Sequence, residues 1–247
     1  MLSAITPRGL EINLDAGLPF EAIEVARQLL RTTRVASLAT IDPSGFPYST
    51  VTNLAVEADG TPFFWVAFLA LHARNIDLDP RVSITVAQDG GDAMTSPRLT
   101  LSGRAERVGH NEIEALKASY LRLYPKGKLY LPLPDTRMYR VRIEGVQLNG
   151  GPARNANNVT PDDLMTDLRG ADDLMEAQAD LAAWLDRDGR ASRLAVIAGA
   201  RPGRWSATMI DPDGVTLSSA SGLARHWFAA PCRTKAAFLA AIGAALA

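Results

Sequence analysis

The sequence predicts an α+β protein, in which an antiparallel β-barrel is followed by a small α+β unit. Short segments with the period-2 alternation of β-strands succeed one another from residue 35 to residue 108. Turn residues such as Asp59-Gly60 separate these segments and supply the backbone conformations that tight hairpins need. From residue 159 onward the pattern changes to helical spacing with a few further strands.

The first unit is predicted to begin with a helix over 19–30, because Phe20, Ile23 and Leu30 have near-helical spacing. Six strands are expected after it, at 35–41, 47–56, 62–68, 81–87, 98–108 and 138–148. A short helical segment at 70–78 ends before Asp79-Pro80, and an amphipathic helix covers 110–124. We expect the strands to close into a barrel, because closure removes exposed sheet edges.

The second unit is predicted to follow a Gly/Asn-rich linker at 149–158, so the expected domains are 1–158 and 159–247. A helix is expected over 174–185, and strands over 193–198, 205–210 and 215–218. A last helix is expected over 235–246, with Thr234 as its N-cap residue.

The composition of the chain argues against several classes of function. The chain has 247 residues, of which 47% are hydrophobic, and a net charge of -1. No charge excess indicates nucleic acid or a membrane surface as a partner. One cysteine, no signal-peptide pattern and no long apolar run predict a cytoplasmic protein. His72, His110 and His226 lack the spacing of metal ligands, so no metal site is predicted. No side chain stands out as a catalytic acid or base, and the catalytic residues remain unknown.

Several motifs between residues 45 and 108 indicate a known superfamily. They are Gly45-Phe46-Pro47, D-P-R-V-S at 79–83 and S-G-R-A-E-R-V at 102–108. With them the segment resembles the pyridoxamine 5′-phosphate oxidase-like, FMN-binding split barrels. The sequence L-A-L-H-A-R-N at 69–75 is similar to a signature of the haem iron utilization (HugZ-like) branch. The resemblance implies a six-stranded antiparallel split β-barrel that holds FMN between the two subunits of a homodimer.

Carried over by position, the resemblance also assigns the cofactor site. Its residues lie on the second and third strands, the short helix and the returning strand: Tyr48, Thr50, Val51, Thr52, Trp65, Val66, His72, Arg74, Asn75 and Arg98. A helix start with cationic side chains suits a dianionic phosphate, which would favour protonated His72. For Trp65, a place in the core or in the dimer interface is the alternative.

The chain departs from the family pattern at several of these positions. Thr50 stands where the oxidases have a phosphate-binding arginine, and Leu71-His72 stands where they have Arg-Lys. Ala67 and Ala73 replace a serine and a threonine. Each lost donor weakens the grip on a phosphate.

Three functions therefore stay open. The resemblance implies an FMN-binding protein, with flavin-dependent oxidoreductase chemistry on a small molecule. The first alternative is a haem-binding or haem-degrading protein, although Gln178 stands where that branch has a candidate iron-ligating histidine and only His226 could substitute. The second is a flavin-free dimeric binding module that retains only the fold.

Overall fold

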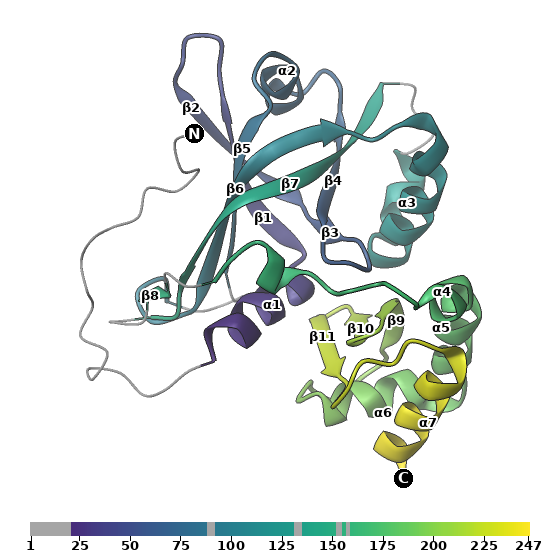
Figure 1. The fold of residues 1–247 in the computed structure, drawn as a ribbon. Helices are drawn as coiled ribbons and strands as arrows, with labels where there is room; N and C mark the ends of the chain where they lie inside the picture. Colours follow the sequence, from purple (N-terminus) through teal and green to yellow (C-terminus); the bar gives the residue numbers. More distant parts are fainter. Residues whose placement is uncertain (1–20, 88–91, 131–134, 152–154, 157–158) are drawn as a thin grey trace.

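The computed structural model describes residues 21–87, 92–130, 135–151, 155–156 and 159–247. Figure 1 shows a curled sheet above a smaller sheet, with helices on the outside of both. All pairings in both sheets are antiparallel. The large sheet has eight strands in the order β2-β1-β5-β6-β7-β4-β3, with β8 paired to β7, and the small sheet has the order β11-β10-β9. The fold class is thus α+β, as predicted.

The bounds of the elements around the large sheet are these: α1 (Ala22–Thr32), β1 (Val35–Ile41), β2 (Pro47–Asn53), β3 (Ala55–Val56), β4 (Pro62–Ala67), α2 (Leu71–Leu78), β5 (Arg81–Ala87), β6 (Arg98–Arg107), α3 (His110–Leu123), the 3-10 helix η2 (Pro125–Leu129), β7 (Thr136–Asn149) and β8 (Asn155–Ala156). Each of the six predicted strands is present, but the predicted count of six is not confirmed. The segment 47–56 forms two strands, because the chain turns inward at the fully buried Leu54. β8 lies within the predicted linker.

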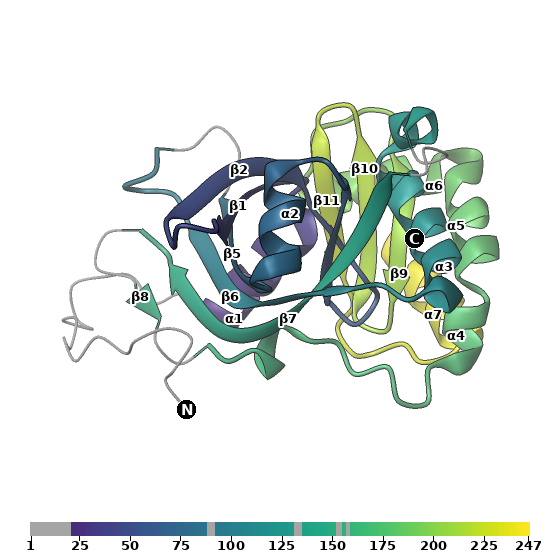
Figure 2. The ribbon, with the colours of Figure 1, turned by 90° about the horizontal axis from the view of Figure 1, so that it is seen from above.

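The large sheet is a half-open barrel rather than a closed one. Alternate residues of β6 are buried, and Leu99 and Leu101 meet Leu38 and Ile84 in one core. The sheet curls most where β6 crosses β7, at a bulge next to Gly103. A Cβ at Gly103 would lie 2.1 Å from the carbonyl oxygen of Arg142, so only glycine fits there. β2 and the β4–β3 side are the two edges of the sheet, and Figure 2 shows β2 and helix α2 lying side by side at the barrel.

The second unit packs helices against the three-stranded sheet. Its elements are η3 (Asp162–Leu164), α4 (Asp172–Glu176), α5 (Gln178–Asp186), η4 (Arg187–Gly189), α6 (Arg190–Ile197), β9 (Ser206–Asp211), β10 (Gly214–Ser219), β11 (Gly222–Trp227) and α7 (Lys235–Leu246). Leu194, Phe238 and Ile242 belong to a core that is separate from the barrel core. Thr234 caps α7 as predicted, because its hydroxyl accepts a hydrogen bond from Ala237 N at 3.1 Å.

The predicted strand over 193–198 is wrong, because these residues belong to helix α6. The apolar run there fits either period when it is read alone. In the structure, Ala191, Leu194 and Ala195 are buried at helical spacing, whereas Val196 and Ile197 are exposed. Strand β11, which the sequence did not predict, completes the sheet instead.

A buried charge cluster, made of Arg31, Asp211 and Arg225, joins α1 to the small sheet. One carboxylate oxygen of Asp211 lies 2.7 Å from Nη2 of Arg225, and the other lies 3.4 Å from Nη1 of Arg31. Arg31 also donates to the carbonyl oxygens of Glu57 and Ala58, both at 3.0 Å. Burial lowers the pKa of Arg31 to about 10, so it stays charged at neutral pH. These contacts hold the small sheet against the barrel.

The domain boundary at residue 158 stays a prediction. Val159 and Leu164 lie beyond it in sequence but pack into the barrel core. None of the helices in the described ranges is long and apolar enough to cross a bilayer.

Candidate functional site

A pocket of about 720 Å³ lies at the open edge of the barrel. We call it the barrel-edge pocket. Its walls come from β2, β4, α3, η2 and the turn between β10 and β11. The residues that the following argument uses are Arg34, Asn53, Trp65, Tyr120, Tyr124, Lys126, Tyr130, Asp135, Ser218 and Ser219. Ligand sites in proteins commonly have this size.

Aromatic rings form one wall of the barrel-edge pocket. The ring centroids of Trp65 and Tyr120 are 5.5 Å apart, and those of Tyr120 and Tyr124 are 4.6 Å apart. The hydroxyl of Tyr124 lies 2.5 Å from the carbonyl oxygens of Arg34 and Leu54, which fixes the ring. Burial raises the pKa values of Tyr120 and Tyr124, so both remain protonated at neutral pH. The wall is therefore apolar, ordered and suited to a flat ligand.

The polar groups of the same pocket are mostly donors. Nε1 of Trp65 and Nε of Arg34 are buried and have no hydrogen-bond partner among the described residues. Lys126 is exposed at the rim, and no ion pair holds its ammonium to a described residue. Asp135 supplies one carboxylate. It lies beside the C-terminal end of β4, where its backbone carbonyl oxygen accepts from Phe68 N. Because a buried donor without an acceptor is costly, this arrangement favours a ligand that brings acceptor or anionic groups.

The site residues expected from the sequence divide among three places. Trp65 and Val66 line the barrel-edge pocket. Thr50, Val51 and Thr52 belong to β2, the strand at the open edge. Val51 is exposed and Thr52 is buried. Tyr48 lies near the start of the same strand, towards the other end of the barrel, and pairs with Thr40.

Helix α2 carries three more of the expected residues. Half-buried His72 has no hydrogen-bond partner for Nε2 among the described residues, and burial lowers its pKa. Without an anion His72 is therefore neutral at pH 7. Arg74 is exposed. Asn75 is buried and donates from Nδ2 to Oγ1 of Thr40 at 3.0 Å, so it ties α2 to β1.

Arg98 lies at the opposite end of the barrel from α2. It pairs with Ala87 at the end of β5, whereas Arg104 pairs with Arg81, next to the end of α2. The six residue steps from Arg98 to Arg104 span about 20 Å of extended strand. Within one chain, Arg98 and His72 therefore cannot bind the same phosphate, and their joint role stays a prediction that requires two chains.

The second unit places neither expected haem-ligand position in the barrel-edge pocket. Gln178 donates from Nε2 to the carbonyl oxygen of Ile210 at 2.5 Å. His226 is half-buried, and its ring packs edge-on against Phe228 with centroids 5.8 Å apart. Burial and the neighbouring Arg225 charge lower the pKa of His226. No group of three His, Cys, Asp or Glu side chains in the described ranges could hold a metal ion.

A comparison with known protein families identifies the family to which this barrel belongs. The family model described as CREG, beta-barrel matches residues 19–162, more than half of the chain. The chain belongs to the CREG β-barrel family. This membership confirms the predicted resemblance to the pyridoxamine 5′-phosphate oxidase-like split barrels. The match covers every strand of the large sheet, whereas the β10–β11 turn that lines the pocket lies outside it.

Two solved structures extend the similarity of this CREG β-barrel protein over both sheets. A protein of unknown function from Agrobacterium tumefaciens is 54% identical, has a TM-score of 0.89 and covers 99% of this chain and 100% of its own. A heme binding protein from Mycobacterium smegmatis is 26% identical, has a TM-score of 0.55 and covers 93% of this chain and 98% of its own.

A curated relative is similar over about half of the chain. The chloroplastic non-canonical heme oxygenase HOZ of Arabidopsis thaliana is 29% identical over 133 residues, which are 53% of this chain and 41% of that protein. The match thus spans about two fifths of the length of the curated relative.

Sequence reasoning missed most of the barrel-edge pocket. Tyr120 on α3 and Tyr124 at its C-cap have i,i+4 spacing, a signal that also fits an ordinary core helix. Arg34 lies in a connecting segment and Lys126 in the short helix η2, and neither belongs to a motif. Ser218 and Ser219 reach the pocket only because the small sheet docks on the barrel, and no local pattern announces such docking.

Proposed function

We propose that the barrel-edge pocket binds a planar aromatic cofactor with anionic groups, and that haem is this cofactor. The observation that carries the proposal is the pair of buried donors without acceptors, Trp65 Nε1 and Arg34 Nε. The ammonium of Lys126 lies at the rim of the same pocket. Support also comes from the similarity to a heme binding protein over 93% of the chain and to a non-canonical heme oxygenase over 53% of it.

The lining residues fit the ring and the carboxylates of haem better than they fit its iron. Trp65 and Tyr120 offer an aromatic surface, and Arg34 and Lys126 offer cations for the two propionates. No histidine, cysteine or methionine is among the described lining residues, so the phenol oxygen of Tyr130 is the available iron ligand. Haem would supply iron-centred redox chemistry, while these residues bind and orient it and exclude water.

FMN is the second candidate, and the absence of an imidazole among the described lining residues favours it. The pyrimidine carbonyl groups and the phosphate of FMN would accept from the same unpaired donors. In that case the protein is a flavin-dependent oxidoreductase, as the resemblance implies. Both cofactors share one chemistry, a flat aromatic body with acceptor and anionic groups, and their absorption spectra distinguish them.

The test is a titration of the full chain with haemin and, separately, with FMN. Absorbance near the Soret band reports haem, and quenching of flavin fluorescence reports FMN. We expect one ligand to bind at micromolar concentration and Lys126→Met to weaken it about tenfold, a loss of ~1.4 kcal/mol. Lys128→Met is the matched control, because Lys128 lies on the same short helix but does not line the pocket. If neither ligand binds at about 100 μM, the proposal fails and a cofactor-free binding module remains.

A second variant locates the cofactor. The resemblance implies a phosphate next to α2, so there His72→Ala would weaken binding and Lys126→Met would not. If the cofactor lies in the barrel-edge pocket, Lys126→Met would weaken binding and His72→Ala would not. A cofactor that responds only to His72→Ala would move the proposed site to α2.

A further inference from the structure

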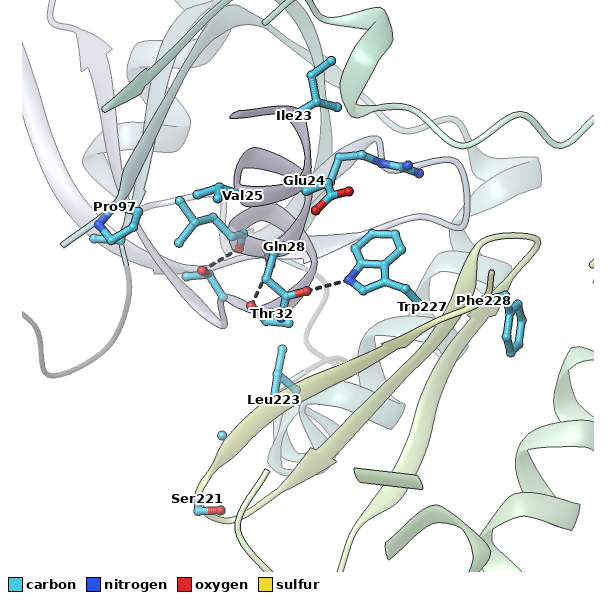
Figure 3. A pocket seen from close by; sticks show the side chains of 15 residues that line it. Ile23, Glu24, Val25, Gln28, Thr32, Pro97, Ser221, Leu223, Trp227 and Phe228 are labelled. Carbon is cyan, nitrogen blue, oxygen red and sulfur yellow. Dashed lines mark hydrogen bonds between the residues drawn. The ribbon is translucent and has the colours of Figure 1, made fainter. Parts of the chain in front are cut away.

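We infer that a second cavity, between α1 and β11, is a binding site for an apolar molecule with a cationic head group. The cavity has a volume of about 930 Å³ and shares no described lining residue with the barrel-edge pocket, although the two linings adjoin at the β10–β11 turn. Figure 3 shows its two walls, the helix α1 and the edge strand β11. Its ligand is independent of the cofactor proposed above.

Both walls of this α1–β11 cavity carry apolar side chains, and the helix wall also carries polar ones, namely Glu24, Arg27, Gln28, Thr32 and Thr33. Ile23, Val25 and Leu29 line it from the helix, and Leu223, Trp227 and Phe228 line it from the strand. Apolar surface that faces a cavity of this size is typical of sites for small organic ligands.

Polar contacts between the two walls fix the spacing of α1 and β11, so the cavity exists before a ligand binds. Nε1 of Trp227 donates to Oε1 of Gln28 at 2.7 Å. The guanidinium of Arg27 pairs with Asp213 and lies 4.9 Å from the centre of the Trp227 ring. These contacts fix the distance between α1 and β11, and a rigid cavity costs a ligand little ordering entropy.

Most polar groups of the cavity already have partners within the protein. Gln28 accepts from Trp227, Thr32 donates to the carbonyl oxygen of Gln28, and Thr33 donates to that of Leu29. Nε of Arg27 is buried without an acceptor, but the charge of its guanidinium is paired with Asp213. The unpaired charge among the described lining residues is that of Glu24, whose exposed carboxylate has no hydrogen bond or ion pair to a described residue. Figure 3 shows Glu24 on the same side of α1 as Trp227. Apolar walls with one unpaired carboxylate complement an apolar body that carries a positive charge.

The test uses a matched pair of probes, 4-phenylbutylammonium and the uncharged 4-phenylbutanol, in calorimetric titrations of the full chain. We expect the cation to bind more tightly than the alcohol, by about fivefold at low salt, since Glu24 is exposed and its attraction is screened. Glu24→Gln removes the charge without changing the shape. It is expected to abolish the preference for the cation and to leave the affinity for the alcohol unchanged.

A filling variant tests the location. Ile23→Trp adds bulk at the cavity wall from a position that is 39% exposed, so the fold tolerates it. Thermal unfolding checks that the variant is folded, and both probes are then expected to lose binding. Equal affinity for the two probes in the wild type, or a cation preference that survives Glu24→Gln, overturns the inference. Failure of both probes to bind at millimolar concentration also overturns it. Haemin and FMN titrations are expected to be unaffected by Ile23→Trp, which keeps this result separate from the proposed cofactor.

Discussion

Trp65 shows how one side chain can carry a functional prediction. Its indole Nε1 is buried without a hydrogen-bond partner among the described residues, although its ring is packed against Tyr120. Trp65→Phe retains an aromatic ring and removes the donor. Because an unsatisfied buried donor costs ~1–3 kcal/mol, the variant is expected to be no less stable than the wild type without ligand. The same change is expected to weaken haemin or FMN about tenfold, as measured by the titrations described above. Unchanged affinity would mean that the N–H does not contact the cofactor.

Asp211 is the residue on which the buried charge cluster depends. Replacing it by asparagine leaves the guanidinium groups of Arg31 and Arg225 buried without a counter-charge. We expect Asp211→Asn to lower the free energy of unfolding by ~3–5 kcal/mol in urea titrations. Glu106→Gln, which removes an exposed partner of Arg142, is the control and is expected to leave the unfolding midpoint nearly unchanged. A small effect of Asp211→Asn would show that water or local rearrangement satisfies both arginines.

The same carboxylate predicts a pH dependence. Burial alone would raise the pKa of Asp211, but the charges of Arg225 and Arg31 outweigh it and hold the pKa below its ordinary value. The ionised form therefore stabilises the fold above the unfolded pKa of about 4, and this contribution is lost as pH falls through the lower folded pKa. We expect the wild type to lose more stability than Asp211→Asn between about pH 5 and pH 2. Parallel stability curves for the two proteins would contradict the assignment.

At the scale of elements, the last helix offers a local test. The Thr234 hydroxyl satisfies one of the free N–H groups at the start of α7. Thr234→Ala is expected to destabilise the protein by ~1 kcal/mol, and Thr234→Ser, which keeps the oxygen, by much less. Urea unfolding of both variants measures the difference. Equal losses would mean that the methyl group of Thr234, rather than its hydroxyl, matters.

Elements were predictable where a pattern has one physical meaning. Alternation with turn residues identified all six long strands of the barrel, and the cap at Thr234 identified α7. The segment 193–198 was wrong because a short apolar run fits a buried helix as well as a strand. The break at Leu54 was missed because the sequence continues its alternation while the chain turns into the core.

At the scale of the whole molecule, the apolar residues around the open edge support the proposed homodimer. Val51 is 68% exposed, and Leu69 and Leu71, close to the start of α2, are exposed as well. Such a patch favours a self-complementary contact between two copies. We expect a dimer in sedimentation at micromolar concentration, and Val51→Lys is expected to shift it towards the monomer. Val196→Lys is the control, because Val196 is also exposed but lies on α6. A wild-type monomer would contradict the proposal.

The candidate site was less predictable than the fold, for a reason that belongs to this scale. Trp65 was assigned from its strand, and it lines the pocket. Arg34, Lys126 and Ser219 reach the same space from a connection, a short helix and a different sheet. Arg34 and Lys126 meet through the fold of the barrel and Ser219 joins them through docking of the small sheet, and sequence spacing encodes neither. The resemblance also assigns Arg98 and the α2 residues to one cofactor site between two subunits, and within one chain they lie at opposite ends of the barrel.

The buried charge cluster also bears on how this sequence can diverge. Its three members come from α1, β9 and β11, and each is neutralised or positioned by the others. A neutral residue at position 211 leaves two buried guanidinium groups without a counter-charge, and one at position 31 or 225 removes one of the two partners of the buried carboxylate. Single substitutions are therefore selected against, most strongly at position 211, while a concerted exchange for apolar side chains is tolerable. Among relatives that keep both sheets, we expect positions 31, 211 and 225 to change together or not at all. Joint conservation of these three positions would then indicate that the small sheet docks on the barrel in related sequences whose structures are unknown.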